Sequence, residues 1–68
     1  MEKGWTLIYV NNQLHKTEIV RAVLEDEGIE SVSMDKRDSS YIFIGDIEVY
    51  VREEDAELAR TIIEKNAL

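Results

Sequence analysis

The sequence has no cysteine, no proline and a single histidine among its 68 residues. The lack of cysteine excludes a disulfide framework, thiol redox chemistry and a cysteine-based zinc site, and it fits a reducing cytoplasm. Basic residues are also few, with eight lysines and arginines against fifteen aspartates and glutamates and a formal charge of −7. Because an acidic surface repels phosphate backbones and anionic membranes, we expect neither nucleic acid nor a membrane as a partner.

Long hydrophobic runs are absent as well, since no apolar stretch approaches the roughly 20 residues that cross a bilayer. Residues 1–5 lead directly into a strand pattern and lack the apolar segment of a signal peptide. We therefore expect a cytoplasmic protein that forms one domain over residues 1–68. A domain of this length buries only about 60% of the surface that its unfolded chain exposes. Its core is small, and association with a partner is the stabilising device that remains open.

The clearest strand pattern lies at residues 46–52. Ile47, Val49 and Val51 alternate there with polar or amphipathic residues, at the period of two that marks a strand with one buried face. We take this strand as the centre around which the rest of the domain is organised.

Three further segments have strand character. Residues 5–10 are aromatic or β-branched almost throughout, which is typical of a strand covered on both faces or carrying an interface on one of them. Residues 29–34 predict a weaker strand, because their alternation is blurred by two serines. Residues 41–44 form either a separate short strand or the start of the central strand, interrupted by a bulge at Gly45.

Residues 13–27 have the apolar spacing of an α-helix. Asn11 and Asn12 precede this segment, and both can cap the first turn of a helix. Gly28 stands where a helix needs a left-handed residue to stop, and Ile29 can fold back onto the last turn as in a Schellman motif. The predicted inward stripe consists of Leu14, Thr17, Ile19, Val20, Val23 and Leu24.

Residues 53–66 predict a second helix. Its first turn is acidic, which suits the positive end of the helix dipole. We interpret these carboxylates as structural. The predicted inward stripe consists of Ala56, Ala59, Ile62 and Ile63.

The element order β-α-β-β-α predicts an α+β domain with a ferredoxin-like split βαβ arrangement and a mostly antiparallel sheet of three to four strands. A right-handed crossover puts both helices on one face of this sheet. The other face is then bare, and strand 5–10 lies at an open edge. On one choice of parity Trp5, Leu7 and Tyr9 share the bare face with Tyr50. An exposed apolar patch of this kind normally has a partner.

Several short segments spread over nearly the whole chain have the character of a scaffold. They are Glu18-Ile19-Val20, Leu24-Glu25, Gly28-Ile29-Glu30, Ile47-Glu48-Val49-Tyr50-Val51, Glu53-Glu54-Asp55, and Ala59 with Ile62-Ile63. Together they resemble the family of putative prokaryotic signal-transducing proteins. The resemblance implies a bacterial domain with a ferredoxin-like α/β fold, distantly similar to regulatory domains that bind small effectors, and without an established biochemical role.

The chain departs from this family's pattern in two respects. Arg52 stands where the family often has proline, so the backbone there keeps a hydrogen-bond donor. Some relatives carry a cysteine-rich tail that is missing from this sequence. No metal-binding role can therefore be transferred from them.

Residues suited to catalysis or metal binding are few and badly spaced. His15 has Glu18 as a helix-surface neighbour, an arrangement that is far more often incidental than catalytic. The acidic clusters at residues 25–27 and 53–55 lack the alternating ligands and the turn glycine of a calcium loop. We therefore expect no catalytic residue, no metal site and no cofactor, and a protein that is not an enzyme.

The aromatic residues form the strongest candidate site. RNA-binding sheets of this fold stack bases on such rings, but they do so in basic surroundings, whereas this chain is acidic. We interpret the set as core or as a self-association surface, because aromatic residues are enriched at interface cores. The hypothesis is a non-enzymatic interaction or regulatory module that forms a homodimer, or binds another protein, through the open sheet face or edge. Its candidate interface residues are Trp5, Leu7, Tyr9, Tyr41, Phe43 and Tyr50.

The polar loop at residues 35–40 supports an alternative hypothesis. Lys36 and Arg37 are the one paired basic site in the chain, and Ser39 and Ser40 follow with hydroxyl groups. Together with the neighbouring Tyr41 they could hold an anionic metabolite at the margin of the sheet. The protein would then be a sensor of a small-molecule effector. An exposed loop without a ligand is the plainer interpretation of the same residues.

Overall fold

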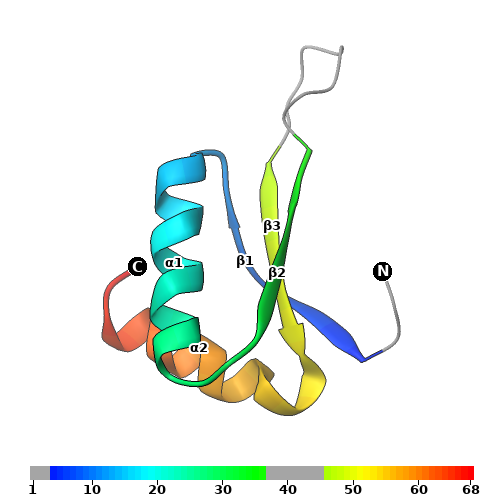
Figure 1. The fold of residues 1–68 in the computed structure, drawn as a ribbon, viewed down its shortest axis with the longest axis vertical. Coiled ribbons are helices and arrows are strands. Elements are labelled where there is room, and N and C mark those ends of the chain that lie inside the picture. Colours follow the sequence, from blue (N-terminus) through cyan, green and yellow to red (C-terminus); the bar gives the residue numbers. More distant parts are fainter. Residues whose placement is uncertain (1–3, 37–45) are drawn as a thin grey trace.

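The computed structural model describes residues 4–36 and 46–68, which form a three-stranded antiparallel sheet with two α-helices on one side (Figure 1). The predicted α+β class and the order β-α-β-β-α are confirmed. The sheet order is β1-β3-β2, so the last strand in the sequence is the central one. The expectation for residues 41–44 falls outside the described residues. The elements are β1 (Trp5–Asn11), α1 (Leu14–Asp26), β2 (Ser31–Asp35), β3 (Ile47–Arg52), the 3-10 turn η1 (Glu53–Asp55) and α2 (Ala56–Lys65).

The central strand β3 carries the middle of the core. It pairs antiparallel with β1 on one side and with β2 on the other. Its alternating apolar residues Ile47, Val49 and Val51 are each 0% exposed. The period-two pattern of residues 46–52 is therefore confirmed, and the intervening side chains of β3 point to the opposite face.

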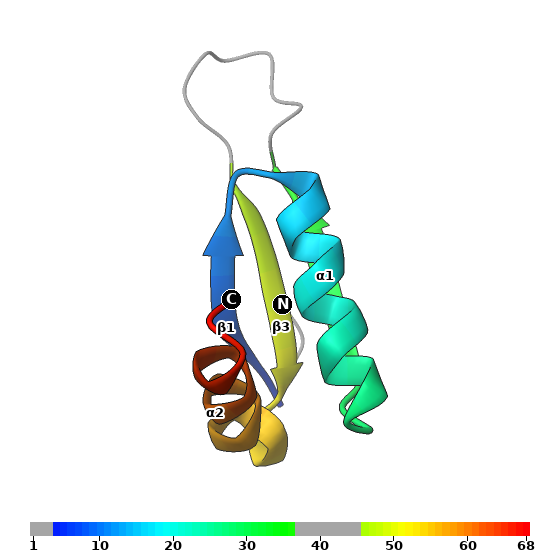
Figure 2. The same cartoon turned by 90° about the vertical axis from the view of Figure 1, so that its left-hand side faces the viewer.

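The two helices cover different strands of the same face. Seen from the helix side in Figure 2, α1 lies over β2 and β3, while α2 crosses the lower part of β1. Ala56 and Ala59 are buried in α2, and their small size lets this helix approach the sheet closely. Neither helix in the described part of the chain is long and apolar enough to span a bilayer.

The end of α1 is a Schellman motif, as predicted. Gly28 has a φ of +83°, a left-handed conformation that glycine adopts without strain. Its N–H donates to the Glu25 carbonyl at 2.9 Å, and the Ile29 N–H donates to the Leu24 carbonyl at 2.9 Å. Ile29 is only 3% exposed, so its packing in the core holds the end of the helix in place.

The inward stripe of α1 is narrower than predicted. Val20, Leu24 and Thr17 are buried, and the Thr17 hydroxyl donates to the Gln13 carbonyl at 3.0 Å. Leu14 and Ile19 are 46% and 39% exposed. They lie about 100–120° around the helix from Val20, on opposite sides of it, because each residue advances by about 100°. Those two members of the predicted stripe were therefore wrong as core residues.

The start of α1 is held by an asparagine in front of the helix. The Asn11 Oδ1 accepts a hydrogen bond from the Gln13 N–H at 2.7 Å. The helix N-cap itself is Gln13, whose side chain makes no capping bond. Neither Asn11 nor Asn12 caps an amide of the first helical turn, so that prediction was wrong, and Asn11 instead stabilises the turn that leads into α1.

A bulge in β1 changes which side chains face the helices. Leu7 pairs with Tyr50 on β3, but Tyr9 pairs with the next residue, Val49, so that Ile8 is an extra residue between them. An extra residue in one strand shifts the alternation of every position that follows. The two halves of β1 therefore have opposite parity.

Tyr9 lies on the helix-covered face because of this bulge. It packs against the core, and its hydroxyl donates to the Leu68 carbonyl at 3.2 Å. The expectation that Tyr9 shares the bare face with Trp5 and Leu7 was therefore wrong for Tyr9. Residues 5–10 are apolar at both odd and even positions, so their sequence pattern could not indicate the bulge.

Truncation of the buried Leu24 tests the position of the core. Leu24 is 0% exposed, so we expect Leu24→Ala to lower the free energy of unfolding by about 2–5 kcal/mol through lost burial and a residual cavity. The matched control is Leu58→Ala, also in a helix but 52% exposed, for which we expect a change within about 0.5 kcal/mol. Urea unfolding followed by circular dichroism measures both. Equal losses in the two variants would contradict the assigned core.

Candidate functional site: the open face of the sheet

The side of the sheet opposite the helices, called the open face, is defined by the register. Residues 48, 50 and 52 of β3 point to it, because their neighbours in sequence point to the helices. Their partners on β1 and β2 lie beside them on the same face. Within the described residues, no helix or strand lies against this face (Figure 1). Its side chains are Trp5, Leu7 and Val10 from β1, Glu48, Tyr50 and Arg52 from β3, and Val32 and Met34 from β2.

The flanking strands make this face largely apolar. Leu7, Val10 and Met34 are 39%, 45% and 41% exposed, and the strand register places all three on this face. Trp5 and Val32 are half-buried by their neighbours alone. A contiguous apolar surface of this kind marks an interaction site more often than a solvated face.

On one half of the open face, three polar side chains contact one another. Lys36 Nζ lies 2.9 Å from Glu48 Oε1, and the Tyr50 hydroxyl donates to the same oxygen at 2.8 Å. The hydrogen bond from Lys36 is the main cause that lowers the pKa of the Glu48 carboxyl below its usual range, and the bond from Tyr50 adds to it. The same contacts with Glu48 raise the pKa of the Lys36 ammonium and of the Tyr50 hydroxyl.

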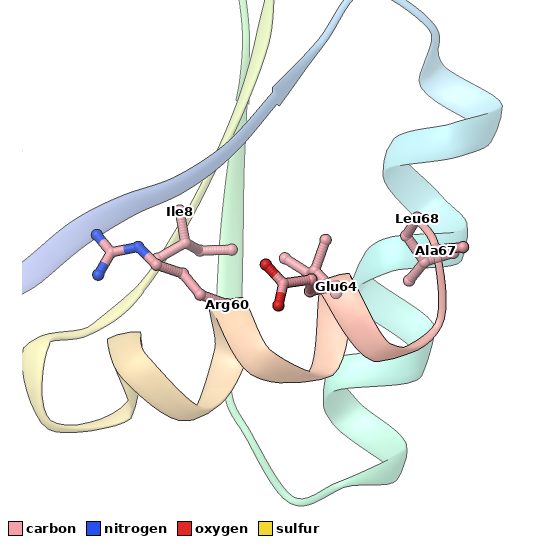
Figure 3. A pocket seen from close by; sticks show the side chains of 6 residues that line it. Ile8, Arg60, Glu64, Ala67 and Leu68 are labelled. Carbon is pink, nitrogen blue, oxygen red and sulfur yellow. The ribbon is translucent and has the colours of Figure 1, made fainter.

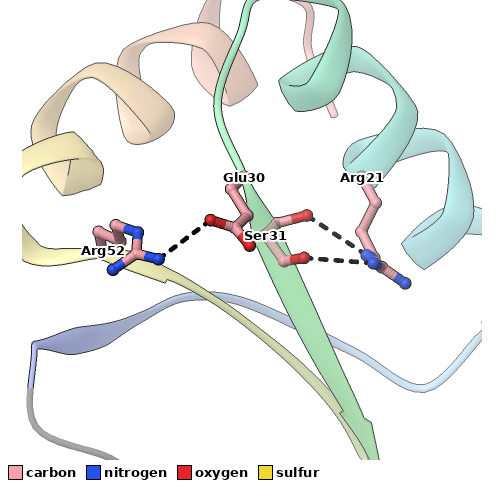
Figure 4. A network of polar contacts seen from close by, with 4 residues as sticks. All are labelled: Arg21, Glu30, Ser31 and Arg52. Carbon is pink, nitrogen blue, oxygen red and sulfur yellow. Dashed lines mark hydrogen bonds and ion pairs between the residues drawn. The ribbon is translucent and has the colours of Figure 1, made fainter.

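The other half of the open face is organised by Arg52. Its guanidinium carbon lies 4.9 Å from the centroid of the Trp5 ring, within the range of a cation–π contact. Its Nη2 also lies 3.1 Å from Glu30 Oε1 (Figure 4). Arg52, at the position where the resembling family often has proline, thus links Trp5 at the start of β1 to Glu30 just before β2.

The charges on the open face cancel, whereas those of the helical side do not. Lys36 and Arg52 are balanced by Glu48 and Glu30. Residues 14–27 carry four acidic and two basic side chains, and residues 53–65 carry five acidic and two basic ones. These two segments therefore account for −5 of the formal charge of −7. Most of the acidic excess therefore lies on the helical segments, whereas the charges that form ion pairs on the open face are balanced.

Among the described residues, two shallow hollows lie on the helical side. The larger, of about 490 Å³, lies between β1 and α2 and is called the α2 groove (Figure 3). A smaller one, of about 160 Å³, lies between α1 and the C-terminal residues, with Lys16 and Ile19 in its wall. The side chains that line the α2 groove are Ile8, Arg60, Ile63, Glu64, Ala67 and Leu68.

The predicted interface residues are distributed over two faces. Trp5, Leu7 and Tyr50 lie together on the open face, and Tyr9 lies on the other side. Tyr41 and Phe43 fall outside the described residues.

Sequence analysis missed three apolar members of the open face. Val10 lies after the bulge, which reverses the parity expected for it. Val32 and Met34 alternate with serines in β2, and that alternation was the signal that could have placed them on one face.

The alternative anion site is only partly within the described residues. Lys36 belongs to it, and its ammonium contacts Glu48. Arg37, Ser39, Ser40 and Tyr41 fall outside the described residues. Among the residues that are described, no three histidine, aspartate or glutamate side chains converge as metal ligands.

The contacts of Glu48 with Lys36 and Tyr50 lead to a prediction about pH. Because Glu48 has a lowered pKa in the folded state, its contribution to stability is present at neutral pH and is lost as the pH falls through that lowered value. We expect Lys36→Ala to raise the Glu48 pKa toward its ordinary value, and Tyr50→Phe to raise it less. NMR titration of the Glu48 side-chain carboxyl carbon measures this. An unchanged midpoint in Lys36→Ala would show that the 2.9 Å contact does not form in solution.

Comparison with known proteins identifies the family but no individual relative. No curated protein and no solved structure matches the chain significantly. A family match covers residues 5–67, which is nearly every residue of the domain described above. The chain belongs to the family described as "putative prokaryotic signal transducing protein".

Proposed function

We propose that the protein is a non-enzymatic interaction module that associates with a second copy of itself through the open face. The observation that carries the proposal is the set of six apolar or aromatic side chains on that face, which nothing covers within residues 4–36 and 46–68. Burying such a surface is favourable at roughly 25 cal/mol per Å² of apolar area before the costs of association. The family description is consistent with a role in signal transduction.

The distribution of charge supports a second copy as the partner. Two copies that approach through their helical sides would bring two acidic surfaces together, which electrostatic repulsion opposes. Two open faces can meet with less repulsion, because Lys36 and Arg52 form ion pairs with Glu48 and Glu30 within each copy. Because these two pairs form within each copy, stacking two sheets about 10 Å apart would bury them as pairs and not as single charges.

A substitution at the far strand of the open face tests this proposal. Met34 is on β2, away from the outer edge of β1, and is 41% exposed. We expect Met34→Lys to raise the dissociation constant of the dimer by about tenfold or more, because the lysine must lose water when the faces meet. Sedimentation velocity over a micromolar dilution series measures the constant.

Leu58→Lys is the matched control. Leu58 is exposed on α2, lines neither hollow, and receives the same change in charge. We expect association to be unchanged or slightly stronger, since the added lysine reduces the net negative charge. A wild-type protein that stays monomeric at the highest concentration, or a dimer that Met34→Lys leaves intact, would refute association through the open face.

A further inference from the structure

The outer edge of β1 has few of the features that protect edge strands in the part of the chain that the structure describes. Within the described residues β1 pairs with β3 on one side and with no strand on the other. Its seven residues include no charged side chain and no proline. Natural edge strands are usually short, charged or interrupted by proline, because their free N–H and C=O groups otherwise recruit another strand. Within residues 4–36 and 46–68, the bulge at Ile8 is the feature that protects this edge.

The opposite edge of the sheet is protected by comparison. β2 has only five residues, and Glu30 and Lys36 flank its two ends. The Arg21 side chain reaches over from α1, where Nη2 donates to the Ser31 backbone carbonyl at 3.2 Å and Nε donates to the Ser31 hydroxyl at 3.3 Å (Figure 4). The two edges therefore differ in length, charge and coverage, and β1 is the edge suited to pairing.

The α2 groove lies directly beside this edge. Ile8, at the middle of β1, faces α2 across the groove (Figure 3). The apolar side chains of Ile63 and Leu68 also line it. Arg60 and Glu64 stand one helical turn apart in the same wall, so the groove carries both signs of charge. In a symmetric contact between two copies, Arg60 of one copy can therefore lie opposite Glu64 of the other.

We propose that β1 pairs antiparallel with β1 of a second copy, so that the two sheets join edge to edge and the two α2 helices pack side by side. A two-fold axis perpendicular to the sheet reverses the direction of α2 between copies. Arg60 of each copy then faces Glu64 of the other, and Ile8 of each lies near the axis. This inference rests on the proposed function in one respect, that the partner is a second copy of the chain. The residues of the edge contact are not on the open face.

Both contacts are isologous, so they can coexist in one closed assembly. Edge pairing gives a six-stranded sheet with all helices on one side, and stacking of two such sheets through their open faces gives a tetramer with two-fold axes. Its mass is about 32 kDa, from a chain of 7.9 kDa. Helices would cover the outside of this assembly, which places its acidic surfaces toward water.

Charge reversal at the α2 groove tests the edge contact. We expect Arg60→Glu and Glu64→Arg, each alone, to raise the dissociation constant of the edge contact by about tenfold or more, because each places two pairs of like charges across the axis. The double variant with both substitutions restores opposite charges and is expected to associate as the wild type does. Sedimentation velocity at low ionic strength measures all three.

The direction of the Glu64→Arg effect separates this contact from general charge repulsion. The variant reduces the net charge from −7 to −5, so repulsion alone predicts tighter association, whereas the edge contact predicts weaker association. Glu25→Arg makes the same change on the exposed surface of α1, outside both hollows, and is the control. Association that responds equally to Glu64→Arg and Glu25→Arg, or no recovery in the double variant, would overturn the edge contact.

The face and edge contacts fail in distinguishable ways. If only the edge contact exists, the wild type is a dimer that Glu64→Arg weakens and Met34→Lys leaves intact. If only the face contact exists, the wild type is a dimer that Met34→Lys weakens and Glu64→Arg does not. The edge proposal is then refuted, while the proposed function stands. A strictly monomeric wild type refutes both.

Discussion

The burial of one face of β3 is the constraint on which the rest of the structure depends. Ile47, Val49 and Val51 are fully buried, and Val49 and Val51 belong to the core cluster that both helices complete. This core is small because the chain is short. Because side chains alternate along a strand, the same burial turns Glu48 and Tyr50 to the opposite face. With both helices committed to one side, those positions meet no second layer within the described residues.

The open face differs from the solvated outer face that antiparallel sheets commonly show. Its charged groups lie on the central strand and at the strand ends, where they pair with each other, and its flanking strands present apolar side chains to water. Such a surface can be covered without leaving a charge unpaired. The acidic helices disfavour face-to-face contact on the helical side, which leaves the open face and the outer edge of β1 as the surfaces where two copies can meet.

The fold could be largely predicted from local patterns, whereas the composition of the open face could not. Period-two alternation at residues 46–52 and the left-handed stop at Gly28 are signals contained in a few neighbouring residues. The bulge at Ile8 has no such signal, because β1 is apolar at both parities, and it decides which residues of that strand are buried. The contact of Lys36 with Glu48 depends on strand register, which the pattern of either segment alone does not fix.

Trp5 is the only tryptophan in the chain, and it lies on the open face, so its fluorescence reports directly on whether a second copy covers that face. The most direct measurement is the acrylamide quenching of Trp5 over a dilution series of the wild-type protein. Association through the open face predicts that quenching is weak at high protein concentration and increases as the protein is diluted below its dissociation constant. Quenching that is equally strong at every concentration, in a protein that stays folded, would contradict it.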